Sequence, residues 1–114
     1  MIIFWSYHFI GAYTSVKQDH YVLILTNDKP GGYYVDLATN HYKLGSNTYA
    51  LDLFNNWQGI CIEPNPMHHI GILSNRRCKL FVNPVSSKSG EEVRFRFKND
   101  GDADMGGLGT CHII

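Results

Sequence analysis

Residues 59–66 read Gly-Ile-Cys-Ile-Glu-Pro-Asn-Pro, and within this stretch a strand gives way to a helix. The apolar run after the glycine predicts a buried strand over residues 59–62. Asn65 can cap the helix that follows, and Pro66 suits the first helical position because its missing N–H is not needed there. This stretch therefore predicts one strand-to-helix unit of an α/β fold.

The helix that starts at Pro66 carries Ile70 and Leu73, which we expect to form its buried stripe. Arg76 and Arg77 lie at its C-terminal end, where positive charge is favourable to the helix dipole. The neighbouring His68 and His69 fall on different faces of the helix and cannot both hold one metal ion. We interpret both histidines as surface residues and predict no metal site.

Two further helices and one strand are expected before this unit. A short helix is favoured from Val16 to about Thr26, because the run from Asn27 to Gly32 is a strong stop signal. Tyr33–Leu37 is a β-rich run bounded by glycines, typical of a buried strand. Ser46 is a plausible N-cap for a second helix that ends around residues 55–56.

After the unit, residues 79–82 form a third strand candidate, and residues 93–97 alternate strictly between apolar and charged side chains. We expect these two strands to form a hairpin. Residues 1–16 are aromatic-rich and show no clear period, so no element is predicted there.

Helices and strands thus alternate, which implies parallel strands with crossover helices. We predict an α/β fold that is one half of a Rossmann-like domain, its sheet mostly parallel and covered on both faces, with a hairpin strand near the C-terminus. The expected organisation is a lead-in with a short helix (residues 1–30), a ligand-binding half (31–98) and an Asp/Gly-rich tail (99–114).

Composition excludes several classes of protein. The chain has 114 residues, enough for one domain, and 44% apolar residues, typical of a folded protein. Ten basic and ten acidic side chains balance, which argues against a nucleic-acid partner or a polybasic membrane anchor. The three cysteines, Cys61, Cys78 and Cys111, show no CxxC spacing. We expect reduced thiols, Cys61 as core filler, and a cytoplasmic protein.

Two carboxylates stand where an α/β sheet binds ligands. Asp36 lies at the end of the first predicted strand and Glu63 directly follows the second. Ligands of open α/β sheets bind at the carboxyl ends of the strands, where a carboxylate can accept hydrogen bonds from both ribose hydroxyls. Glu63 could equally cap a loop or the N-terminus of the next helix, and position alone favours the ligand role only slightly.

The order and spacing of several blocks resemble the FkbM family of S-adenosylmethionine-dependent methyltransferases. The blocks span about residues 17–97, and they are residues 31–40, 46–51, 57–66, 73–78 and 83–86. The sharpest is Ile62-Glu63-Pro64-Asn65-Pro66 after a Trp-x-Gly. The resemblance implies a Rossmann-like methyltransferase fold and transfer of a methyl group, usually to an oxygen.

The resemblance also implies the roles of single residues. Glu63 would hold the ribose hydroxyls and Pro64 would shape the adenosine wall. The loop from Asp36 to Asn40 would face the methionine part of the cofactor. The expected cofactor-binding residues are Asp36, Ala38, Asn40, Ser46, Asn47, Glu63, Pro64 and Ser86, with Val85 beside Ser86 near the adenine. No catalytic residue is assigned; His41 could take a proton, but it fits a solvated loop residue better.

The chain departs from the family pattern in two respects. The family usually has a glycine where Ala38 stands and an Asp-Gly-type pair where His41 and Tyr42 stand. Strands and helices that complete a family domain and form its acceptor pocket do not follow, so we expect a truncated fold whose open sheet edge is covered by a partner or by another copy of the chain. The alternative is a catalytically silent fragment or binding module. A nicotinamide- or nucleotide-binding domain would need a GxGxxG loop, which the sequence lacks.

Overall fold

A computed structural model describes residues 2–5, 18–93, 95–97 and 106–108 of the chain. Its elements, in chain order, are β1 (Ile2–Trp5), α1 (Gln18–Leu25), β2 (Tyr33–Leu37), α2 (Tyr49–Phe54), β3 (Gln58–Ile62), the 3₁₀ turn η1 (Pro66–His68), α3 (His69–Asn75), β4 (Lys79–Phe81), β5 (Phe95–Phe97) and β6 (Gly106–Leu108).

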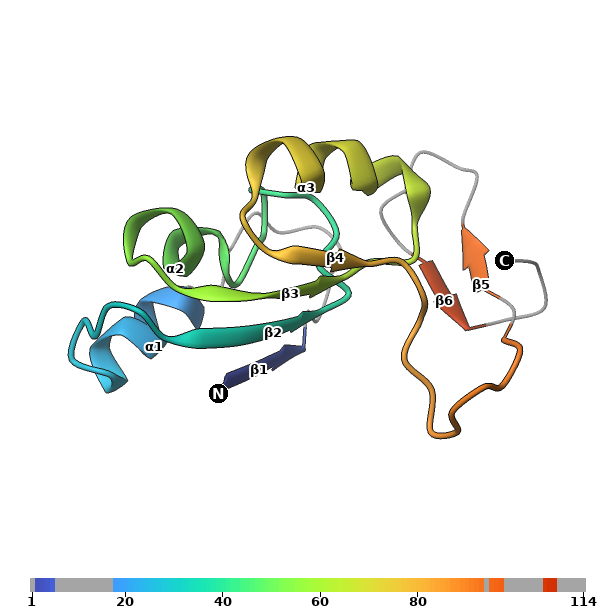
Figure 1. The fold of residues 1–114 in the computed structure, drawn as a ribbon, viewed down its shortest axis with the longest axis horizontal. Coiled ribbons are helices and arrows are strands. Elements are labelled where there is room, and N and C mark those ends of the chain that lie inside the picture. Colours follow the sequence, from blue (N-terminus) through green and yellow to red (C-terminus); the bar gives the residue numbers. More distant parts are fainter. Residues whose placement is uncertain (1, 6–17, 94, 98–105, 109–114) are drawn as a thin grey trace.

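The main sheet is entirely parallel, with strand order β1-β2-β3-β4 (Figure 1). β2, β3 and β4 alternate with the helices α2 and α3, so the predicted small α/β domain is confirmed. In the register, Asp36 of β2 lies beside Cys61 of β3, and Leu37 beside Ile62. The carboxyl ends of these two strands therefore meet at one edge of the sheet.

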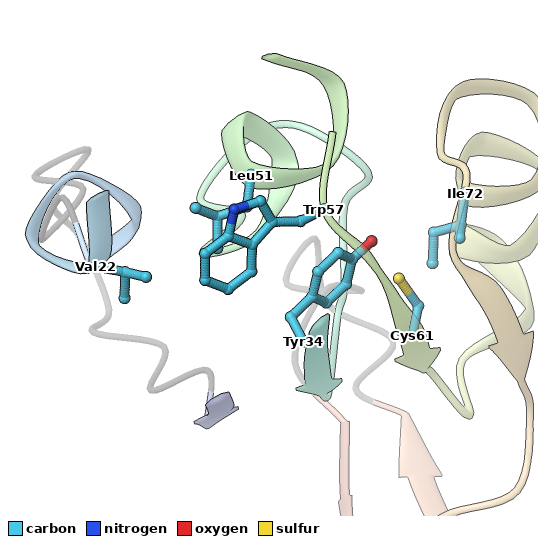
Figure 2. Packing of buried hydrophobic residues seen from close by; sticks show 6 residues of the cluster. All are labelled: Val22, Tyr34, Leu51, Trp57, Cys61 and Ile72. Atoms are coloured by element: carbon cyan, nitrogen blue, oxygen red, sulfur yellow. The ribbon is translucent and has the colours of Figure 1, made fainter. Parts of the chain in front are cut away.

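The core lies between this sheet and the three helices. Val22 of α1, Leu51 of α2 and Ile72 of α3 pack with Tyr34 and Cys61 of the sheet in one cluster (Figure 2). Burial alternates along β2 and β3, and the buried side of the sheet, which bears Tyr34 and Cys61, packs against all three helices. The described helices accordingly cover one of the two faces that we expected to be covered.

Close packing in this core explains one glycine. A Cβ added to Gly59 would lie 2.5 Å from the backbone oxygen and the ring of Tyr34 on the neighbouring strand. The Tyr34 ring therefore occupies the place that a larger residue at position 59 would need, and β3 can pair with β2 only because that side chain is missing.

The C-terminal hairpin differs from the prediction. β5 pairs antiparallel with β6, in a separate two-stranded sheet, whereas β4 pairs parallel with β3. The partner of residues 93–97 therefore lies within the segment 99–114 that we expected to be a tail. β1 is a second element that the sequence did not predict, and it extends the sheet beyond β2.

Helix α3 buries a different face from the predicted one. Ile70 and Leu73 are 78% and 66% exposed, and the buried residues of this region are His68, Ile72 and Arg76, spaced four apart. Residues four apart share a helix face. Two of the three are polar, so an apolar pattern could not indicate this face.

The cysteines also differ from the prediction. Cys61 and Cys78 form a disulfide that links β3 to the residue before β4. Cys61 is fully buried, as expected of core filler, but its thiol is not reduced. The expected cytoplasmic location was inferred from reduced thiols, so this disulfide removes the argument for it. In the part of the chain that the structure describes, no helix has the length and apolar character needed to cross a bilayer.

Candidate functional site

The candidate site is built where β2 and β3 end. Glu63 follows β3 directly and is 5% exposed. Its Oε2 accepts the backbone N–H of Asn40 at 2.6 Å, and its Oε1 accepts that of Asn65 at 2.8 Å. The carboxylate thus ties the loop after β2 to the turn that enters η1, and Pro64 lies inside that turn.

The loop that joins β2 to α2, residues 38–48, is called here the β2–α2 loop. Ala38 and Asn40 both have positive φ, at 57° and 61°. Both residues have a Cβ that crowds the backbone in this left-handed region, but asparagine tolerates it better than alanine because its polar side chain can hydrogen-bond locally. Residue 38 therefore has a backbone conformation that favours glycine, although it is an alanine. The resemblance implies a glycine at this position.

Asp36 lies at the end of β2 with its side chain fully buried. Its Oδ2 accepts the hydroxyl of Thr48 at 2.5 Å, and no hydrogen-bond partner reaches its Oδ1. Burial raises the pKa of the Asp36 carboxyl to about 6; the Thr48 hydrogen bond and the charge of Arg76 oppose the rise, and the charge of Glu63 adds to it. Asp36 is thus a carboxyl that can change protonation state close to neutral pH.

Ser46 and Asn47 have partly structural roles. Thr48 is the N-cap residue of α2, but it makes no side-chain capping bond. Instead, Ser46 Oγ accepts the backbone N–H groups of Thr48 and Tyr49, at 3.3 and 3.1 Å. The predicted capping function of Ser46 is present, shifted by two residues from the cap position, and Asn47 beside it is buried.

His41 and Tyr42, which stand where the resemblance implies an Asp-Gly-type pair, both make contacts within the fold. His41 Nδ1 accepts the backbone N–H groups of Lys43 and Leu44, and its ring stacks on that of Tyr42 with centroids 4.5 Å apart. The Tyr42 ring contacts α3 at Gly71, where an added Cβ would lie 3.0 Å from it. A bulky Tyr42 is therefore accommodated because α3 has a glycine opposite it.

Ser86 lies apart from the other expected residues. Its hydroxyl donates to Glu91 at 3.0 Å, within the exposed loop after β4. Its neighbour Val85 lines an open, mainly apolar pocket of about 440 Å³, shared with Asn83 and with the apolar residues Ile60, Ile62, Leu80, Phe81 and Val82. Ile62, which lines this pocket, is the last residue of β3 and directly precedes Glu63 in the sequence.

His68 and His69 were predicted to be surface residues, and neither is fully exposed. His68 is buried, and His69 is half-buried with its Nε2 2.6 Å from the carbonyl oxygen of Glu63. Among the residues described, no three His, Cys, Asp or Glu side chains come together as a metal site would require.

The most connected side chain of the region was not among the expected site residues. Arg76, assigned only to the helix dipole, is buried and hydrogen-bonded to Asp52 of α2 at 2.8 Å. Burial of Asp52 acts to raise its pKa, but hydrogen bonds from Arg76 and from the backbone N–H of Arg77 outweigh it and hold that pKa below its usual range. An acid flanked by leucines at positions 51 and 53 is the one sequence signal that could have indicated a buried ion pair.

Comparisons with family models, with curated proteins and with solved structures find no match for this chain.

Proposed function

We propose that this chain binds S-adenosylmethionine at the carboxyl edge of its parallel sheet and acts as an FkbM-type methyltransferase on an oxygen of its acceptor. One observation carries the proposal. The carboxylates at the ends of two adjacent parallel strands, Asp36 and Glu63, lie at the same sheet edge, and the β2–α2 loop is hydrogen-bonded to Glu63 between them. Ligands of open α/β sheets bind at such an edge.

The orientation of Glu63 fits a ribose. Two backbone N–H groups hold its carboxylate in place, one on each oxygen. A carboxylate that is held before the ligand arrives loses little conformational entropy on binding. Glu63 would therefore hold the two ribose hydroxyls, as the resemblance implies.

The pocket beside Ile62 and Val85 fits an adenine. Ligand pockets are mainly apolar with a few polar groups, and a flat aromatic ring such as adenine buries well against aliphatic and aromatic side chains. Phe81 and Asn83 are among the residues that line this pocket. Ser86 would then act through the loop that carries Val85.

Methyl transfer demands little covalent chemistry of the protein. S-adenosylmethionine supplies a methyl group on a sulfonium, which is already a good leaving group. The chain's own contribution is alignment and exclusion of water. His41 is no longer a good base candidate, because its Nδ1 already accepts two backbone N–H groups.

That same observation favours a second candidate, a module that binds the cofactor without turnover. His41 is the base candidate of the β2–α2 loop, and its ring nitrogen stabilises the loop by accepting two backbone N–H groups. Release of S-adenosylhomocysteine in the presence of hydroxyl acceptors separates the two candidates, since only the enzyme forms this product.

Calorimetric titration with S-adenosylmethionine tests the proposal. We expect the wild-type chain to bind weakly and Glu63→Gln to lose about tenfold or more in affinity, since one charged hydrogen-bond acceptor is worth about 1.5 kcal/mol or more. Glu92→Gln is the matched control, an exposed glutamate that should leave binding unchanged. No heat with the wild type, or equal affinities for wild type and Glu63→Gln, would contradict the proposal.

A further inference from the structure

Arg76, which directly follows α3, bonds to the β2–α2 loop through both terminal nitrogens of its guanidinium group. One terminal nitrogen donates to the backbone oxygen of Tyr42 and to Ser46 Oγ, each at 3.2 Å. The other donates to Thr48 Oγ1 at 2.6 Å. Nε donates to Asp52 on α2, so one side chain joins the loop to two helices.

A short chain of hydrogen bonds continues from Arg76 to the proposed ligand edge. Thr48 Oγ1 accepts from Arg76 and donates its single proton to Asp36 Oδ2. Arg76 also donates to the hydroxyl of Tyr34, which in turn donates to Asp52. All of these side chains are buried, so their hydrogen bonds do not compete with bulk water.

Arg77, the next residue, provides a contrast. It donates to the other oxygen of Asp52 at 3.0 Å, but its side chain is 51% exposed. Its other side-chain partner is Asn56, which follows α2, so in the described residues it bonds to no part of the β2–α2 loop. Two adjacent arginines thus share one acid, and one of them binds the loop.

We propose that Arg76 is a positioning residue that fixes the β2–α2 loop in the conformation that receives S-adenosylmethionine. The loop contains Ala38, Asn40, Ser46 and Asn47, four of the expected cofactor-binding residues, and this part of the inference rests on the proposed function. A lysine could not substitute, because only the planar guanidinium places donors on five acceptors in different directions.

Hydrogen exchange and cofactor titration of the full chain test this role in Arg76→Lys, with Arg77→Lys as the matched control. Loss of one or two net hydrogen bonds should raise exchange at the amides of residues 41–48 about tenfold or more in Arg76→Lys. Amides of β3 should keep their rates, and Arg77→Lys should match the wild type throughout. Affinity for S-adenosylmethionine should fall about fivefold in Arg76→Lys and stay within about twofold in Arg77→Lys.

Exchange needs no ligand, so it separates the two ideas. A wild-type chain that binds no cofactor overturns the proposed function, and with it the cofactor part of this inference. Unchanged exchange at residues 41–48 in Arg76→Lys, or a uniform rise over the whole molecule, overturns the positioning role itself.

If Arg76→Lys does not fold, Thr48→Val takes its place, because it leaves the pair of Arg76 and Asp52 intact. It should loosen the same loop, and Thr48→Ser, which restores the hydroxyl, should return wild-type exchange. Equal exchange in Thr48→Val and Thr48→Ser would overturn the role.

Discussion

Reducing the bond between Cys61 and Cys78 should lower the free energy of unfolding by about 3 kcal/mol. The two cysteines are 17 residues apart. In the chain-entropy model, a crosslink that closes a loop of this size removes that much conformational freedom from the unfolded chain. A typical domain is stable by only about 5–15 kcal/mol, so the change is large.

Urea unfolding with and without dithiothreitol measures this contribution. We expect the wild type to unfold at clearly lower urea when reduced, and Cys78→Ala to be less stable and insensitive to the reductant. Cys111→Ala is the control, since removal of a cysteine outside the disulfide should leave the effect of the reductant unchanged.

Thiol counting gives an independent check. Of the three cysteines two are paired, so the unfolded, unreduced chain should present one free thiol. Three free thiols, or a wild-type unfolding curve that dithiothreitol does not move, would refute the reasoning. The same result would restore the argument for a reducing compartment.

Three further predictions, one of them with a control substitution, test the site and the packing. Folded Asp36, with its pKa raised to about 6, holds its proton more tightly than the unfolded chain does, so its stabilising effect is complete below about pH 4 and is lost as pH rises to about 6. In urea unfolding, Asp36→Asn should therefore gain about 2 kcal/mol relative to the wild type between these pH values, and a constant difference would contradict this. Ala38→Gly should raise the free energy of unfolding by up to about 1 kcal/mol, because glycine relieves the positive φ at this position. Ala50→Gly in α2, the control, should lower the free energy of unfolding by about 1 kcal/mol. Equal effects of the two substitutions in thermal unfolding would show that φ is not the cause. Gly59→Ala should lower it by about 3 kcal/mol through the clash with Tyr34, and an unchanged melting temperature would disprove the close approach.

Sequence patterns were sufficient for the elements whose signals are local. β2 has the predicted bounds, Tyr33–Leu37, and β3 and β4 differ from the prediction by one residue at one end. Asn65 caps η1 by accepting the N–H of Met67 at 3.2 Å, with Pro66 at the first position. Such signals depend on backbone geometry and on neighbours within a few residues, so a sequence contains them in full.

The candidate site was predicted only in part. Glu63 and Asp36 lie at one sheet edge, as parallel strands require, and Asn40 reaches Glu63 through its backbone. Ser86 is bonded to Glu91, and Tyr42, which stands where the resemblance implies a glycine, packs beside Gly71. The contact of Tyr42 with Gly71 joins residues about 30 apart, which no local pattern can indicate.

Apolar periodicity, caps and turn residues act within each segment, and these local signals were enough to predict the alternation of strands and helices. The buried faces, the partner of residues 95–97 and the pairing of the cysteines depend on contacts that form only when the chain folds. This dependence is clearest at Arg76. A buried guanidinium is stable only where several distant acceptors converge on it, and its partners come from residues 34, 42, 46, 48 and 52, which folding alone brings together.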